Sequence, residues 1–286
     1  MKEFLIFTNK HKDPELTVTR RIEHYLNAHG AGVSVHVLQS DWKRTEDSGD
    51  FVFPPKVECV LVLGGDGTVL KAARQMMDEQ VPIIGVNLGS LGYMTEIDLE
   101  CLEESLDKLL QDEYETECRM MLEGCVQFAD GAFQKGHCLN DIVISRIGSL
   151  QIMKFNIWVN GRFLNEYSGD GMIVTTPTGS TGYNLSAGGP IVEPGARMIM
   201  LTPICPHTLN QRSIILSPED VIEIQIPEGK EGQKQQMEVT FDGNHKVQVT
   251  TGDKIRVVQS DKVTEFIKVS QVSFLDVLHK KLSEKA

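Results

Sequence analysis

The sequence predicts an α/β domain built on a doubly wound parallel sheet, followed by a β-rich, sandwich-like domain. In the first part of the chain, apolar strand-like runs alternate with stretches of helical spacing, which is typical of strand-helix-strand units around a parallel sheet. In the second part, short alternating stretches separated by turn dipeptides replace this pattern. We expect the two domains at residues 1–118 and 119–267. Helical spacing returns within residues 268–286, at Val272 to Leu282, and we expect this helix to pack back on the first domain.

The first domain opens with a strand, a helix and a strand. Glu3 to Thr8 and Gly32 to Leu38 have strand-like patterns, and the apolar residues of Pro14 to Ala28 have helical spacing. Val57 to Leu63 is a continuous apolar run, which is typical of a strand buried on both faces of a parallel sheet, and Thr68 to Met77 is helical. The remaining elements are a buried strand at Val81 to Val86 and an amphipathic helix over Leu99 to Leu110.

The second domain is marked by hairpin dipeptides. Asp130-Gly131, Asn160-Gly161 and Asp242-Gly243 each separate two alternating stretches, and such dipeptides are the strongest short-range signals for a β-hairpin. Two polar segments, Thr45 to Asp50 and Gly229 to Gln236, are predicted to be exposed loops.

Composition narrows the function classes. The 286 residues are 41% apolar, so a sizeable core can form, and the formal net charge of −12 argues against nucleic acid as a partner. No apolar run approaches the roughly 20 residues of a membrane span, and the N-terminus does not resemble a signal peptide. The six cysteines form no Cys-x-x-Cys pair, as expected for reduced thiols in the cytoplasm. We therefore expect a cytoplasmic protein without a membrane segment.

The most informative segment is Gly64 to Val69, which follows a predicted buried strand and opens a helix. Ligands of open α/β sheets bind at the carboxyl ends of strands, and glycines allow close approach and positive φ angles, so a phosphate cradle is predicted. The loop is neither a P-loop nor a Gly-x-Gly-x-x-Gly motif. Its one carboxylate, Asp66, would hold magnesium or accept a hydroxyl proton, as in phosphoryl transfer. The alternative is a tight turn with Asp66 as the helix N-cap.

A second cluster runs from Asp170 to Tyr183 and on to Pro190, and it is dense in hydroxyl groups and glycine. Such a stretch offers many hydrogen bonds but only Asp170 as a charge, which suits a neutral polar group such as adenine or ribose. The ring of Tyr183 is suited to lie against a base. The alternative is a turn region between strands with no ligand.

Several short motifs occur together in one order, and the set resembles the NAD kinase family over about residues 57 to 245. The Gly-Gly-Asp-Gly loop is shared with phosphofructokinases and lipid kinases, whereas Thr-Pro-Thr-Gly-Ser-Thr followed by Ser-Ala-Gly-Gly-Pro is characteristic of NAD kinases. In chain order the motifs are Gly64 to Thr68, Leu139 to Asp141, Asp170-Gly171, Thr176 to Thr181, Ser186 to Pro190, Ile204 to His207 and Phe241 to Gly243.

The resemblance implies an enzyme that transfers the terminal phosphoryl group of ATP to the adenosine-ribose 2′-hydroxyl of NAD, giving NADP and ADP. It further implies a divalent metal ion such as magnesium, a homodimer or homotetramer, and an active site between the two domains. By similarity, Asp66 is the catalytic base. The phosphate site implied by the resemblance comprises Gly64, Gly65, Gly67 and Thr68. The implied NAD site comprises Asp66, Gly67, Lys71, Tyr93, Asn140, Asp141, Asp170, Thr181, Gly182, Tyr183 and Ser186, and no residue is assigned as a metal ligand.

The chain departs from the family pattern at a few positions. Ser168 stands where many members have arginine, so a cationic contact to the substrate is missing or is supplied from elsewhere. Gly182 replaces the more usual alanine, and Asn244 stands where glutamine is common. Lys71 has the alternative interpretation of a solvated helix lysine. Cys205-Pro206-His207 has no second ligand pair or triad partner, so we interpret it as a buried structural turn and not as a metal or nucleophile site.

Two other functions stay open at this point. One is a kinase with a different acceptor, a lipid or a sugar phosphate, although a lipid acceptor predicts an amphipathic membrane-binding segment that the sequence lacks. The other is a dinucleotide-binding sensor without catalysis, against which the carboxylate of Asp66 argues. Donors other than ATP, and NADH as an acceptor, are equally open.

Overall fold

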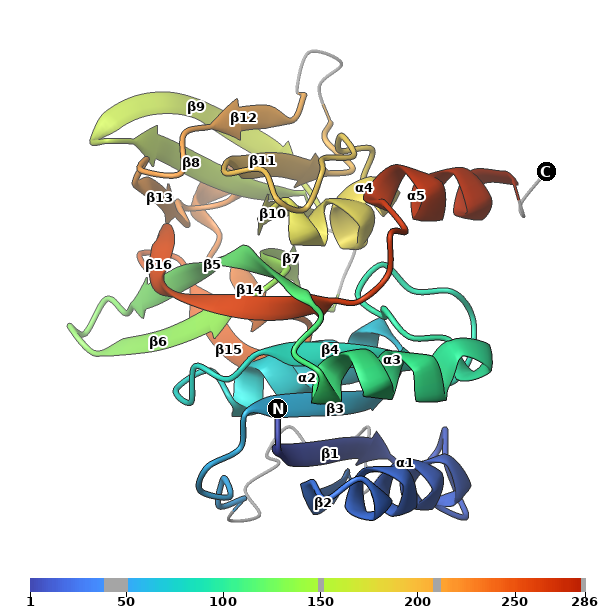
Figure 1. Ribbon diagram of the computed structural model, residues 1–286. Coiled ribbons are helices and arrows are strands. Elements are labelled where there is room, and N and C mark those ends of the chain that lie inside the picture. The colour runs from blue at the N-terminus through green and yellow to red at the C-terminus, as the bar shows by residue number, and fades with distance from the viewer. Residues whose placement is uncertain (39–50, 149–151, 208–211, 284–286) are drawn as a thin grey trace. The chain divides into compact units, whose positions relative to one another are not determined.

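The computed structural model describes residues 1–38, 51–148, 152–207 and 212–283 (Figure 1). The chain divides into two compact units, which we call unit 1 (residues 1–119 with 263–286) and unit 2 (residues 120–262). The C-terminal segment therefore belongs to unit 1, and it starts at Val263, several residues before the expected boundary at 267. The predicted loop Thr45 to Asp50 and the last three residues, 284–286, lie outside the described residues.

The sheet of unit 1 is parallel and doubly wound, as predicted. Its strand order is β2-β1-β3-β4, so the chain moves outward from β1 to β2 in one direction and from β3 to β4 in the other. The topological switch point therefore lies between β1 and β3. The elements are β1 (Glu3–Asn9), α1 (Thr17–Ala28), β2 (Gly32–Leu38), β3 (Cys59–Gly64), α2 (Asp66–Gln75), β4 (Ile83–Asn87), the 3-10 turn η1 (Leu99–Cys101) and α3 (Leu102–Leu110).

Helices cover both faces of this sheet. On one face, α1 and α3 bury Ile22, Leu26, Leu102 and Leu106 against alternate residues of the strands, such as Phe4. The buried residues of α2 are absent from that cluster although α2 contacts β1, β3 and β4, which places α2 on the opposite face. This arrangement explains why the predicted strand at Val57 to Leu63 reads as a continuous apolar run, since both of its faces are buried.

Helix α1 begins later than the predicted Pro14, at Thr17, because Asp13 caps it. The Asp13 carboxylate accepts hydrogen bonds from the Val18 and Thr19 amides and the Thr19 hydroxyl. These bonds lower the pKa of Asp13 against the opposing effect of burial, which is the largest single influence on that pKa. Leu16 lies in the left-handed region with φ 54°, so it turns the chain into the helix.

Unit 2 is built from antiparallel strands, and the sandwich-like prediction is confirmed. One sheet has the order β12-β11-β10-β7-β14-β15. In a second layer the strand order is β16-β13-β8-β9. The strands that begin in or enter unit 2 are β5 (Glu115–Gln127), β6 (Phe133–Cys138), β7 (Asp141–Arg146), β8 (Met153–Val159), β9 (Arg162–Gly169), β10 (Gly171–Thr175), β11 (Ile199–Ile204), β12 (Ile214–Leu216), β13 (Ile222–Gln225), β14 (Gln236–Phe241), β15 (His245–Thr250) and β16 (Lys254–Lys268). The short helices are η2 (Thr178–Thr181), α4 (Tyr183–Ser186) and η3 (Lys230–Gly232).

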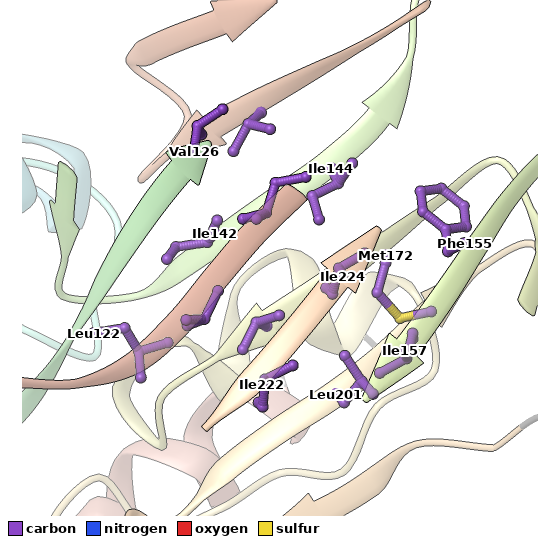
Figure 2. Packing of buried hydrophobic residues seen from close by; sticks show 14 of the residues in the cluster. Leu122, Val126, Ile142, Ile144, Phe155, Ile157, Met172, Leu201, Ile222 and Ile224 are labelled. Carbon is purple, nitrogen blue, oxygen red and sulfur yellow. The ribbon is translucent and has the colours of Figure 1, made fainter. Parts of the chain in front are cut away.

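The two layers of unit 2 enclose one apolar core. Figure 2 shows its side chains: Ile142 and Ile144 of β7, with Met172 and Leu201, come from one layer, whereas Phe155, Ile157, Ile222 and Ile224 come from the other. Burial of such side chains stabilises the unit by roughly 1.5–3 kcal/mol each. The core fixes which face of β7 points inward; β7 begins at the candidate residue Asp141, and the candidate residue Asn140 directly precedes it.

All three predicted hairpins form. Asp130-Gly131 joins β5 to β6, Asn160-Gly161 joins β8 to β9, and Asp242-Gly243 joins β14 to β15. In the last two, both turn residues have positive φ (52° and 73°, 49° and 68°), as a type I′ turn requires. The predicted exposed loop Gly229 to Gln236 needs a correction, because Gln235 is buried and its side-chain amide donates to the carbonyls of Lys154 and Pro227.

The C-terminal segment is tied to unit 1. Glu96 accepts hydrogen bonds from the Val269 and Ser270 amides. Helix α5 (Phe274–Ser283) follows, and its residues Phe274 and Lys281 lie against the ring of Tyr93, with centroid distances of 5.9 and 4.7 Å. No helix in the described part of the chain is long and apolar enough to cross a membrane.

Candidate functional site

The carboxyl ends of the parallel strands of unit 1 bring three loops together at the switch point. Asn9 ends β1, Gly64 ends β3 and Asn87 ends β4. The Asn9 amide donates to the Thr68 hydroxyl over 3.2 Å, so it links the first and third strands across the switch point. This is the place where open α/β sheets bind ligands.

The reason for glycine in the Gly64 to Gly67 loop differs from the one predicted. Gly64, Gly65 and Gly67 are all outside the positive-φ region, so the expectation of left-handed glycines was wrong. Gly64 is needed because a Cβ there would lie 2.3 Å from the Thr68 hydroxyl oxygen, whereas a Cβ at Gly65 or Gly67 would meet nothing within 4 Å. Open space above the first turn of α2, with no side-chain cap at Gly65, leaves helix amides available to a phosphate.

Asp66 is held in place by a neighbouring loop. The Tyr93 amide donates to Oδ2 and the Met94 amide donates to Oδ1, each over 3.0 Å. Asp66 is the first residue of α2 and the N-cap is Gly65, so the alternative of Asp66 as N-cap is wrong. A Cβ on Gly92 would lie 2.2 Å from Oδ1 of Asp66, so the loop requires glycine there. The carboxylate is thereby oriented at the edge of the glycine loop.

Three further side chains of unit 1 lie in α2 or in the loops that follow β1 and β4. The ring of Tyr93 is half-buried against α5, and burial, with a smaller effect from Asp66, raises the pKa of its hydroxyl. Lys71 lies half-buried on α2, one turn beyond Asp66. Lys12 was missed by the sequence analysis, and its Nζ lies 3.4 Å from the place of a Cβ on Gly89. The switch-point rule could have found Lys12 and Asn9, because Asn9 ends β1 and Lys12 follows it.

In unit 2, Asp242 shapes the segment that carries Asn140 and Asp141. Its Oδ2 accepts from the Leu139 amide over 2.9 Å, and its Oδ1 accepts from the Asn140 and Asp141 amides over 2.8 and 3.1 Å. The Asp242-Gly243 turn therefore has a second role beside closing a hairpin. It orders the backbone just before β7.

Asn140 presents an unsatisfied polar group. Its Oδ1 is buried and has no hydrogen-bond partner among the described residues, and the same is true of the Thr178 hydroxyl. The Asn140 carbonyl accepts from the Thr175 hydroxyl and the Thr176 amide, both over 2.9 Å, so the residue itself is firmly placed. Buried polar atoms are rarely left unpaired in folded proteins, which points to a ligand that completes Asn140.

Asp141 is buried beside Asp242. Loss of solvent, reinforced by the charge of Asp242, raises the pKa of Asp141 to about 7. The carboxyl is thus partly protonated near neutral pH and can both donate and accept a hydrogen bond.

The pKa of Asp141 predicts a pH dependence of stability. The folded chain keeps a proton on Asp141 up to about pH 7, whereas the unfolded chain releases it near 3.8. The free energy of unfolding of the wild type therefore falls as the pH rises from about 4 to about 7. Asp141→Asn stays neutral, so we expect its advantage in unfolding free energy over the wild type to be larger at pH 8 than at pH 5, by on the order of a few kcal/mol. Urea unfolding of both proteins at the two pH values measures the difference, in which other titrating groups cancel. An equal gap at both pH values would contradict the raised pKa.

The hydroxyl-rich stretch is mostly used within the protein. Thr175, Thr176, Thr178, Ser180 and Asn184 are buried. The Thr176 hydroxyl donates to the Leu139 carbonyl and the Ser180 hydroxyl to the Val192 carbonyl. The expectation that many hydroxyls face a ligand therefore needs correction, since fewer of them are accessible. Among the residues of the predicted NAD site, Thr181, Gly182, Tyr183 and Ser186 are at least partly exposed, and the Asn140 side-chain nitrogen lies 3.6 Å from the place of a Cβ on Gly182.

Asp170 lies between β9 and β10 and forms an ion pair with Arg146, whose Nε lies 3.1 Å from Oδ1. The Ser168 carbonyl accepts from the His207 amide over 2.9 Å. Cys205 has φ 44° and is exposed, so Cys205-Pro206-His207 is a turn but not a buried one.

Comparison with known proteins decides the family. Residues 4–114 match the family model of the ATP-NAD kinase N-terminal domain, and residues 139–269 match that of the ATP-NAD kinase C-terminal domain. The chain is 45% identical to the NAD kinase of Lachnospira eligens over 293 aligned residues, which cover 99% of this chain and 100% of that one. This chain belongs to the NAD kinase family.

Further relatives agree. The NAD kinase of Lachnoclostridium phytofermentans is 42% identical, with 100% of both chains covered. Among solved structures, yeast NADH kinase complexed with NADH has a TM-score of 0.83 at 24% identity, covering 99% of this chain and 88% of that one. An Archaeoglobus fulgidus NAD kinase in complex with ATP has a TM-score of 0.75 at 24% identity, covering 98% and 99%. These two likenesses establish the NAD kinase fold.

Within this NAD kinase fold, the predicted site residues fall into two groups. Unit 1 brings Asp66, Thr68 and Tyr93 together around the glycine loop, with Lys71 further along α2. Unit 2 brings Asn140 beside Gly182, and Asp170 contacts Arg146. The sequence analysis missed Arg146, Asp242, Asn9 and Lys12, and of these only Asp242 lies in a recognised motif.

Proposed function

We propose that this chain transfers the terminal phosphoryl group of ATP to the adenosine-ribose 2′-hydroxyl of NAD, giving NADP and ADP. The observation that carries the proposal is Asp66: two backbone amides orient its carboxylate beside a glycine loop with open space and available amides. Relatives named NAD kinase, aligned over the whole chain, support the same reaction.

In the proposed reaction, the 2′-oxygen bonds to the γ-phosphorus while the bond to the β-phosphate oxygen breaks and ADP leaves. Asp66 takes the hydroxyl proton, which suits a carboxylate held at a fixed orientation. Little covalent chemistry is required of the protein, so positioning and charge neutralisation account for most of the rate.

The phosphate site would comprise Gly64, Gly65, Gly67 and Thr68. The NAD site would be formed by Asp66, Gly67, Lys71, Tyr93, Asn140, Asp141, Asp170, Thr181, Gly182, Tyr183 and Ser186. The unpaired Oδ1 of Asn140 and the exposed ring of Tyr183 support the second group.

Magnesium fits this chemistry as a metal carried by the donor. The described residues contain no cluster of three or more His, Cys, Asp or Glu side chains suited to a protein cage, so the ion would be held mainly by the phosphates of ATP. When bound, the ion would neutralise phosphate charge. A homo-oligomer in the cytoplasm completes the proposal, and the six free thiols suit a reducing compartment.

An acceptor panel tests the proposal against its rivals. With magnesium and ATP, we expect NAD to yield NADP, detected with an NADP-specific dehydrogenase, and NADH to be tested beside it as a second dinucleotide acceptor. Sugar phosphates and diacylglycerol vesicles should accept no phosphate. Phosphorylation of either without any from NAD would favour a kinase of another acceptor, and NAD binding without turnover would favour a sensor.

Asn140 gives a more specific prediction. We expect Asn140→Ala to raise the KM for NAD about tenfold or more, because it removes a buried Oδ1 that has no partner among the described residues, and to leave the KM for ATP within about twofold. The matched control is Asn165→Ala, which alters an exposed residue of β9. Steady-state kinetics with each substrate varied in turn would refute the assignment if both KM values rose equally.

A further inference from the structure

Arg146 and Asp170 form the one candidate-site ion pair that the sequence did not foresee. Arg146 ends β7 and Asp170 precedes β10, and the Arg146 amide donates to the Asp170 carbonyl over 3.1 Å. Their side chains meet as well, Nε to Oδ1 over 3.1 Å, and are 23% and 34% exposed. The pair is therefore partly shielded from solvent and held by its backbone, which makes its geometry more constrained than that of a surface ion pair.

The fixed position of Asp170 has a second support. The Asp170 amide donates to the Ile204 carbonyl over 2.9 Å, so the residue is held between β7 and β11. The Arg146 guanidinium binds one carboxylate oxygen, and the other, Oδ2, remains able to accept a hydrogen bond from a ligand hydroxyl. Arg146 thus decides which way the Asp170 carboxylate points.

The positive charge of Arg146 also affects the electrostatics of the candidate dinucleotide site. The candidate dinucleotide site of unit 2 contains the carboxyl groups of Asp141, Asp170 and Asp242, whereas a dinucleotide brings a negatively charged diphosphate. A bare carboxylate near such a ligand would oppose binding. A guanidinium on Asp170 offsets its charge and keeps its hydrogen-bonding oxygen.

We infer that Arg146 is a positioning residue for the dinucleotide: it orients Asp170 toward a ribose hydroxyl and offsets the charge of Asp170 toward the diphosphate. The inference rests on the proposed function insofar as NAD is the ligand. It assigns to Arg146 an effect on dinucleotide affinity, with no role in the phosphoryl donor site.

The strand register offers a compensating position. Ser168 and Asp170 both bond to the chain that contains β11, through His207 and Ile204 respectively. Position 168 lies at the end of β9, two residues before Asp170, so the long side chain of an arginine there is within reach of the same carboxylate. A variant that adds an arginine at position 168 can therefore restore the positive charge beside Asp170 without the Arg146 side chain.

The test measures NAD binding by calorimetry, without ATP, beside the KM values for NAD and ATP. We expect Arg146→Ala to weaken NAD binding and raise its KM about tenfold, with the KM for ATP within about twofold and the melting temperature little changed. The double variant Arg146→Ala with Ser168→Arg should recover affinity to within about threefold of the wild type. Lys154→Ala is the control, because it removes another ion pair of unit 2, with Glu166.

Each outcome bears on one claim. Unchanged NAD affinity in a folded Arg146→Ala protein, equal rises in both KM values, or no recovery in the double variant would overturn the inference. If Arg146→Ala unfolds, Arg146→Gln keeps hydrogen-bond donors without the charge, and unchanged NAD affinity there would likewise overturn it. A wild type that binds NAD but makes no NADP would refute the proposed function alone, because the binding measurement still tests Arg146.

Discussion

Asp66→Asn is expected to lower kcat about 1,000-fold while NAD and ATP binding stay within about twofold of the wild type. The amide has nearly the same shape as the carboxylate, but it cannot take the proton of the attacking hydroxyl. Asp66 is oriented by the Tyr93 and Met94 amides, so its carboxylate is placed and not merely present. Initial rates at saturating substrates, with calorimetric binding of NAD, measure both quantities.

The control for this variant is Asp261→Asn, an identical chemical change at an exposed position of unit 2. Its kcat should equal that of the wild type. A folded Asp66→Asn enzyme with near-normal turnover would show that another group accepts the proton. Loss of NAD binding together with turnover would show that Asp66 acts mainly through NAD binding and not through proton transfer.

Gly92→Ala is expected to lower kcat about 100-fold through a displacement of Asp66. The new Cβ would lie 2.2 Å from Oδ1 of Asp66 and 2.9 Å from the Thr95 hydroxyl, so one of these groups must move. The Asp66 carboxylate is the end of a side chain and moves at less cost than backbone. We therefore expect a folded protein with a misplaced base, and a larger effect on kcat than on either KM.

Ser90→Ala is the matched control for Gly92→Ala, since it changes an exposed residue of the same loop. It should retain wild-type kinetics and the same melting temperature. If Gly92→Ala kept full activity, Asp66 would tolerate displacement and the orienting role of the Tyr93 loop would be wrong. If it unfolded, movement of the Asp66 side chain would not be enough to relieve the clash.

Much of the fold could be predicted from short sequence patterns. The Asp-Gly and Asn-Gly dipeptides predicted three hairpins, and in two of them both turn positions have positive φ, which few residue pairs tolerate. Continuous apolar runs placed β3 and β4, since both faces of these strands are buried. Local signals failed where the cause was distant or specific to one contact. Gly64 is needed for its approach to the Thr68 side chain and not for its φ angle.

The residues of the candidate site could be predicted from the sequence, but the groups that bind and orient them could not. The chemistry of a glycine loop pointed to Asp66, whereas the two amides that orient it come from a loop 27 and 28 positions further along the chain. Arg146 and Asp170 are 24 positions apart and meet only because β7 and β10 pair. Register between strands is set by the whole core of unit 2, so no local pattern reveals this contact.

The most direct test of the proposed reaction is its stoichiometry. Purified protein with magnesium, ATP and NAD is followed by phosphorus NMR for ADP and for a phosphate on the adenosine ribose, and NADP is counted with an NADP-specific dehydrogenase. We expect one NADP for each ADP, with the new phosphate on the 2′-oxygen. ADP without NADP, or a phosphorylated dinucleotide that the dehydrogenase does not reduce, would contradict the assignment of NAD as acceptor and of its 2′-hydroxyl as the reacting group.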